Sequence, residues 1–232
     1  MKRFYKEATT ATADGGGHTV LLDGRPVRTP KKAPLVLPTA ALADAVAAEW
    51  AVQGEQIKPS DMHLLRLSNA AIDLIPAKRE EVLAATAPYG ETDLLYYRDE
   101  IGTELRAEQD AAWQPHLDWA AARYRIAFRI VDRLIAEPQP DGTAAALRRA
   151  LEAGDDMALA GLSDLTAMFG SLVLTLAVWE AATDIDTAFA AARLDEAYQE
   201  QRWGIDAEAA RRTERRLVEA RAGARFLALL KG

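Results

Sequence analysis

The sequence predicts an α+β protein, with a small N-terminal antiparallel β-containing domain over residues 1–60 and a larger all-α domain over residues 61–232. Two observations carry this prediction. Up to about residue 38, turn residues alternate with short runs of β-branched and aliphatic residues, as they do in short strands. From Asp61 onward the apolar residues recur with helical spacing, and Pro and Gly interrupt them where helices are expected to end.

A β-hairpin is the most specific local signal in the N-terminal part. Asp23-Gly24 separates the run 18–22 from a second run, 25–29. A type I′ turn requires positive φ at its central residues, which Asp and Gly tolerate, so the two runs predict paired antiparallel strands. Pro26 indicates that the returning strand lies at a sheet edge, because proline cannot donate a ladder hydrogen bond. The three glycines 15–17 predict the tip of another hairpin.

One helix completes the predicted N-terminal domain. Thr39 stands where it can cap a helix over residues 40–52. Leu42, Val46 and Trp50 recur at helical spacing within that segment. We therefore expect a small sheet with one covering helix.

Two segments of the helical domain carry specific predictions. Residues 165–179 are the most apolar segment and are apolar on all sides of a helix, which predicts a single buried central helix. The segment is shorter than the roughly 20 apolar residues that a membrane span needs. Residues 186–203 predict a second helix, which Gly204 ends.

The composition excludes several kinds of chemistry and partner. The 232 residues contain no cysteine, which excludes disulfides, thiolate nucleophiles and Cys-ligated metal sites. A net charge of −7 repels phosphate backbones, so we expect no nucleic-acid partner. The N-terminus lacks the apolar run of a signal peptide. We therefore expect a cytoplasmic protein without membrane insertion.

Residues that could support catalysis are sparse. The three histidines are scattered, and none has a partner at a metal-ligand spacing, so we expect no metal and no cofactor. Asp93, Arg98 and Asp99 gather in one short segment, as the acid/base groups of a small hydrolase or transferase would. The alternative interpretation is architectural. In that case Asp93 caps a helix or fixes a turn, and Arg98 pairs with a nearby acid.

The most informative surface lies on the predicted helix 186–203. Four of its residues fall at i, i+3, i+4 and i+7 and therefore share one face: Glu196, Gln199, Glu200 and Trp203. Acids beside a tryptophan suit a protein-binding surface, because Trp supplies contact area while the acids steer a basic partner. Alternatively, Trp203 packs under the next helix. We expect the helix to pack inward through a second face, made of Ala190, Leu194, Ala197 and Tyr198.

A series of short segments gives the sequence its family resemblance. In chain order they are Phe4-Tyr5-Lys6, the hairpin 20–30, Glu49-Trp50 with 53–57, the segment 92–98, Trp113-x-Pro115 with Trp119, Leu194-Asp195-Glu196 to Gln199, and Trp203-Gly204-Ile205-Asp206. By their order and spacing together, the chain resembles the ATP12 family, chaperones that bind the unassembled alpha subunit of the soluble ATP synthase head. The resemblance spans most of the chain. Tyr96 departs from it, since relatives are expected to carry a cysteine commonly at that position.

The resemblance implies a binding protein with no cofactor and no reaction. Its partner would be the alpha subunit, which the chaperone keeps from aggregating until the beta subunit displaces it. The resemblance implies a contact surface made of Asp195, Glu196, Gln199, Glu200, Trp203 and Asp206. We expect the free chain to be a monomer, because it has no sustained heptad repeat. We expect a mitochondrial matrix location only for relatives that carry a transit peptide. A helical adaptor for another protein is the remaining alternative.

Overall fold

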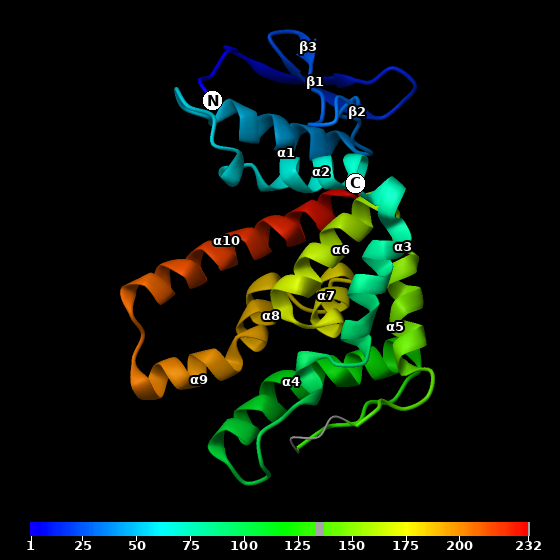
Figure 1. The fold of residues 1–232 in the computed structure, drawn as a ribbon, viewed down its shortest axis with the longest axis vertical. Helices are drawn as coiled ribbons and strands as arrows, with labels where there is room; N and C mark the ends of the chain where they lie inside the picture. The colour runs from blue at the N-terminus through cyan, green and yellow to red at the C-terminus, as the bar shows by residue number, and fades with distance from the viewer. Residues whose placement is uncertain (133–136, 232) are drawn as a thin grey trace. The chain divides into compact units, whose positions relative to one another are not determined.

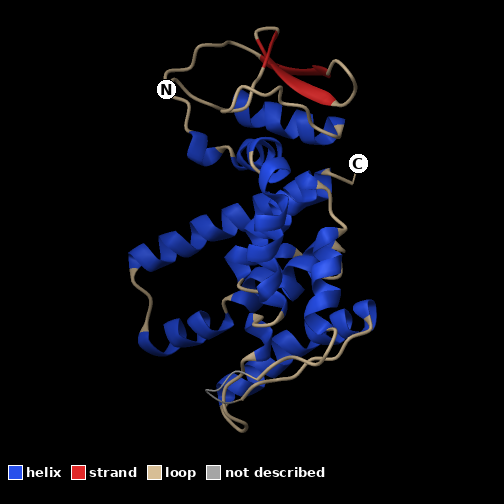
Figure 2. Cartoon of the chain, turned by 45° about the vertical axis from the view of Figure 1, so that its right-hand side comes forward, coloured by secondary structure: helices blue, strands red, loops and turns tan. Residues whose placement is uncertain are grey.

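The computed structural model describes residues 1–132 and 137–231. Among them, strands occur only near the N-terminus, and most of the rest is helical (Figures 1 and 2), so the predicted α+β class is confirmed. The strands are β1 (Ala8–Thr12), β2 (His18–Leu22) and β3 (Arg25–Pro26). The α-helices are α1 (Ala40–Ala51), α2 (His63–Asp73), α3 (Ile75–Thr86), α4 (Glu104–Tyr124), α5 (Thr143–Glu152), α6 (Asp156–Phe169), α7 (Leu172–Trp179), α8 (Ile185–Ala192), α9 (Leu194–Trp203) and α10 (Ala207–Leu229). Short 3-10 helices are η1 (Pro59–Asp61), η2 (Ala87–Gly90) and η3 (Leu94–Tyr96).

The chain forms two compact units, and each is built from more than one stretch of sequence. Unit 1 contains Met1–Arg79, Gly154–Gly161 and Ala222–Gly232. Unit 2 contains Glu80–Ala153 and Leu162–Arg221. Three of the four boundaries between them therefore fall inside α3, α6 and α10, and the fourth lies between α5 and α6. The division into domains at residues 60 and 61 stays a prediction.

The small sheet of unit 1 is antiparallel with the strand order β1-β2-β3. Asp23 and Gly24 both have positive φ, 47° and 78°, and they join β2 to β3, which confirms the predicted hairpin turn. Pro26 lies in β3 at the end of the strand order, as expected. The glycines 15–17 form the turn between β1 and β2, as predicted for a hairpin tip.

Helix α1 covers the sheet, as predicted (Figure 1). The Thr39 hydroxyl accepts a hydrogen bond from the backbone N–H of Leu42 at 3.1 Å and so caps the helix. Leu42 and Val46 are fully buried, and Trp50 is 8% exposed. The carboxylate of Glu49, on α1, accepts hydrogen bonds from backbone N–H groups at the start of α2. These bonds fix the two helices to each other.

Distant segments of the chain pack closely within unit 1. A Cβ atom added at Gly161, on α6, would lie 2.7 Å from Leu227 Cδ2 on α10. The side chain of Thr39 also reaches this region, because its hydroxyl donates to the carbonyl of Leu229 at 2.7 Å. The C-terminal end of α10 is therefore part of the core that holds α1 and α6.

The apolar segment 165–179 is buried as predicted, but the prediction of one helix is wrong. Gly170 has φ 66°, which ends α6, and Ser171 begins α7. The Ser171 hydroxyl accepts from the backbone N–H of Leu174 at 3.0 Å, a capping bond that favours a new helix start. Within the part of the chain that the structure describes, no helix has both the length and the apolarity that crossing a membrane would require.

Candidate partner-binding surface

The predicted helix over residues 186–203 is wrong as a single element. The structure has two helices there, α8 and α9, with Arg193 at φ −115° between them. The indole Nε1 of Trp113 donates to the carbonyl of Ala191 at 2.8 Å and so occupies an acceptor that a continuous helix would use. Arg193 then turns to pair with Glu200 at 2.7 Å.

Helix α9 lies on the surface with no buried side chain. The predicted inward face is wrong, since Ala190 and Ala197 are exposed and the two larger residues of that face are only half-buried. Polar contacts with α4 hold α9 instead. Gln109 Nε2 donates to Asp195 at 2.8 Å, and Arg202 pairs with Glu104 at 2.5 Å. The position of α9 is thus set by hydrogen bonds and ion pairs rather than by a buried apolar face.

Three of the six candidate contact residues are exposed on α9. Glu196 and Gln199 are exposed, and Trp203 is 77% exposed at the end of the helix. The alternative that Trp203 packs under the next helix is therefore wrong. Ile205, which directly follows the helix end, is also 47% exposed. Two apolar side chains thus stand in solvent where the chain passes from α9 to α10.

The other three candidate residues have structural contacts of their own. Asp195 is half-buried beside α4, and burial raises the pKa of its carboxyl group. Glu200 is paired with Arg193. The Asp206 carboxylate accepts from two backbone N–H groups at the start of α10, each at 2.8 Å, and these bonds lower its pKa. Asp195 and Glu200 therefore help to hold α9 in place, and Asp206 caps α10.

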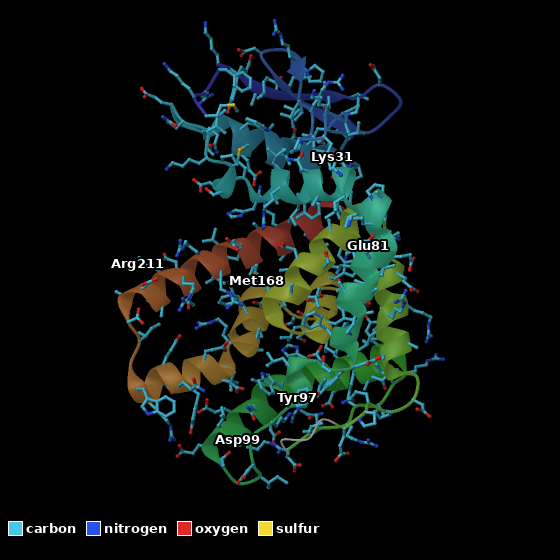
Figure 3. All side chains as sticks on the ribbon, in the orientation of Figure 1. Lys31, Glu81, Tyr97, Asp99, Met168 and Arg211 are labelled. Carbon is cyan, nitrogen blue, oxygen red and sulfur yellow. The ribbon has the colours of Figure 1, made fainter. Side chains whose placement is uncertain are left out.

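A cavity of about 300 Å³ lies beside the acidic part of α9, in unit 2. Arg216 on α10 lines it and donates to the carbonyl of Met168 on α6 at 2.8 Å. Figure 3 labels Met168. Its lining residues are Leu94, Trp113, Ala167, Met168, Phe169, Gly170, Ala192, Asp195, Glu196 and Arg216. The sequence reasoning missed this cavity and the arginines of α10. The sequence did contain a signal for the arginines, because Arg211, Arg212, Arg215 and Arg216 recur at helical spacing.

Comparison with known proteins identifies the family. The family model of the ATP12 chaperone protein matches residues 2–121. The solved structure of Atp12 from Paracoccus denitrificans is 41% identical, with 99% of this chain and 98% of that chain covered and a TM-score of 0.92. This chain belongs to the ATP12 chaperone family.

Two further structures agree with this assignment. A point mutant of the Paracoccus denitrificans Atp12p is 40% identical, with coverage of 99% and 97% and a TM-score of 0.92. A protein from Agrobacterium tumefaciens is 39% identical, with coverage of 99% and 86% and a TM-score of 0.94. The similarity to ATP12 proteins therefore extends over the helical part that lies beyond the family match.

In this ATP12 protein, Asp93 has an architectural role. The side chain has no exposed surface, and it accepts backbone N–H groups from Leu95 at 3.1 Å and from Val173 at 3.0 Å. Asp93 therefore caps η3 and also ties it to the start of α7. Burial raises its pKa to about 6, although the hydrogen bonds it accepts oppose that rise.

Arg98 and Asp99 contact other groups than Asp93. The Arg98 guanidinium is buried, pairs with Asp110 and donates to Gln114 at 2.9 Å. The Asp99 carboxylate accepts from the hydroxyl of Thr103 at 2.8 Å, next to α4 (Figure 3). The capping and pairing expected under the architectural interpretation are therefore present.

Proposed function

We propose that this ATP12 protein binds the unassembled alpha subunit of the ATP synthase head and keeps it from aggregating until the alpha/beta head forms. Membership of a chaperone family supports the class of activity. The observation that carries the choice of surface is Trp203, a tryptophan that is 77% exposed on a helix with no buried side chain. Tryptophan is enriched at the hot spots of protein interfaces, and Trp203 stands close in sequence to the exposed Ile205.

The proposed contact surface consists of the six candidate residues in two roles. Glu196, Gln199 and Trp203 are free to contact the alpha subunit directly. Trp203 supplies apolar contact area, and Glu196 steers a basic patch of the partner toward it. The remaining three, Asp195, Glu200 and Asp206, hold the surface in place through their own contacts.

An aggregation assay tests the proposal. Isolated alpha subunit is diluted from denaturant, and light scattering is followed with and without an equimolar amount of this chain, in buffer that contains no nucleotide. We expect the chain to suppress most of the scattering, because the covered apolar surface is no longer available for self-association. Purified beta subunit added afterwards should release the alpha subunit into an alpha/beta complex on a sizing column.

The control for the assay is an unrelated acidic protein at the same mass concentration. Equal scattering with the control and with this chain refutes the proposal. A helical adaptor that binds a different protein is then the better interpretation of the chain. Suppression that strictly requires ATP hydrolysis by this chain would also count against it, since a passive binding surface needs no such energy.

A further inference from the structure

A second cavity, of about 580 Å³, lies in unit 1, far along the sequence from α9. Three aromatic side chains line it: Phe4, Tyr5 and Trp50. The Tyr5 hydroxyl donates to the carbonyl of Trp50 at 2.6 Å, and the two rings meet edge to face at 5.5 Å between centroids. Phe4 extends this cluster outward and is 65% exposed. We call this space the Trp50 cavity.

The indole of Trp50 is a donor without an acceptor. Trp50 is 8% exposed, and its Nε1 atom has no hydrogen-bond partner among the residues that the structure describes. A buried donor left unpaired costs about 1–3 kcal/mol, so native proteins rarely keep one without a reason. Trp50 lines the cavity, so a ligand oxygen that reaches its Nε1 atom would supply the missing acceptor.

The rim of the Trp50 cavity is positively charged. Arg25 and Arg28 line it, and both are exposed. Arg25 forms no ion pair with any described residue. The single acid of the lining, Asp23, is already engaged by the backbone N–H groups of Lys6 and Glu7. Residues 1–32 hold seven Lys and Arg against three Asp and Glu, although the whole chain carries −7. The rim therefore favours an anionic ligand.

We propose that the Trp50 cavity binds an acidic segment of a client polypeptide, by taking up one large apolar side chain of that segment. The aromatic walls accept the apolar side chain, Arg25 and Arg28 pair with its flanking carboxylates, and Trp50 Nε1 donates to a ligand oxygen. The inference rests on the proposed function only in that the ligand is taken to be a polypeptide. It adds a second, basic contact surface to the acidic one on α9.

Peptide titration of the full chain, labelled with ¹⁵N, tests this proposal without the alpha subunit. The probes are acetyl-Glu-Glu-Phe-Glu-Glu-amide, the same peptide with Ala in place of Phe, and the same peptide with Lys in place of every Glu. The indole signal of Trp50 is the one of five that disappears in Trp50→Phe. We expect it to shift saturably with the first peptide, which should bind more than about tenfold tighter than either of the others.

Surface variants separate a charge effect from misfolding. Arg25→Glu should weaken the first peptide about tenfold and favour the Lys peptide, because the rim has lost its positive charge. Lys58→Glu makes the same charge change in unit 1 outside the cavity and should leave binding within about twofold. Equal binding of the three peptides, or an unmoved Trp50 signal, overturns the proposal.

The same titration distinguishes this inference from the proposed function. Trp203→Ala should leave all three peptide titrations unchanged, since Trp203 belongs to the α9 surface. A chain that binds the acidic Phe peptide but does not protect the alpha subunit refutes the proposed function alone. A chain that protects the alpha subunit but shows no peptide preference refutes the Trp50 cavity alone.

Discussion

Asp93 illustrates how a polar residue can organise a buried region. Its carboxylate reaches backbone N–H groups at the start of two elements, Leu95 in η3 and Val173 in α7. These groups lack partners within their own helices, because the first N–H groups of any helix do. One side chain thereby satisfies orphan donors of two elements that are distant in sequence. Burial makes its charged form unfavourable, and the pKa rises to about 6.

The raised pKa of Asp93 predicts a pH-dependent contribution to stability. Its pKa rises from an ordinary 3.8 to about 6 in the folded protein, so the folded state binds the proton more tightly than the unfolded state. The stabilisation is complete below about pH 4 and is lost as the pH rises through about 6. We expect the unfolding free energy of wild type relative to Asp93→Asn to fall by about 2 kcal/mol between pH 4 and pH 7.

Urea unfolding of both proteins at several pH values measures this difference. Comparison with the Asn variant cancels the other titrating groups, which both proteins share. If the difference in unfolding free energy between the two proteins stays constant or grows with pH, the pKa of the Asp93 carboxyl group lies at or below its ordinary value. The carboxyl group is then more hydrated than its burial in the structure implies.

At the scale of single elements, α9 is stabilised by polar contacts and leaves its outer face to solvent. Trp203→Ala should therefore change the unfolding free energy by less than about 0.5 kcal/mol, as other exposed substitutions do. Affinity for the alpha subunit should fall by about 2 kcal/mol, roughly thirtyfold, if the tryptophan is a binding hot spot. Thermal melting and surface plasmon resonance on the same preparations provide the two measurements.

Val52→Ala is the matched control, because Val52 is 79% exposed and belongs to unit 1, whereas α9 belongs to unit 2. It should alter neither stability nor affinity.

Glu196→Lys tests the charged part of the surface. It should mainly slow association, and more so at low salt, because exposed charges are screened beyond about 10 Å at 0.1 M. Glu200 is a poor choice for reversal, since a lysine there would face Arg193. A sharp loss of melting temperature in Trp203→Ala with normal binding by Glu196→Lys would contradict the assignment.

Elements whose signals are local could be predicted from the sequence, and those set by distant contacts could not. The Asp23-Gly24 turn and the Thr39 cap follow from the conformational preferences of the residues at those positions. The break between α8 and α9 depends on the indole of Trp113, which comes from another helix. Periodicity could place Glu196 and Trp203 on one face, but it could not show that α9 lacks a buried side. The cavity beside α9 likewise needs α4, α6 and α10 together.

At the scale of the whole molecule, the chain returns twice to the unit in which it begins. Residues 154–161 and 222–232 join the N-terminal 79 residues in unit 1. The Thr39 hydroxyl bonded to Leu229 and the close approach of Leu227 to Gly161 are two of the contacts that result. Sequence periodicity carries no information about such returns, because it reports the face of an element that is buried but not the element that covers it.

This discontinuity predicts that the first 60 residues do not fold alone. In a fragment of residues 1–60, the Glu49 carboxylate lacks the N–H groups of Leu64 and Leu65, and Thr39 lacks the carbonyl of Leu229. A domain of about 60 residues buries only about 60% of its unfolded surface, so it has little stability to lose. We expect far-ultraviolet circular dichroism of the fragment to show no cooperative melting, whereas the full chain melts in a sharp transition. A sharp transition and a well-dispersed NMR spectrum for the fragment would instead establish residue 60 as a domain boundary, because the hairpin and α1 would then form a sufficient core by themselves.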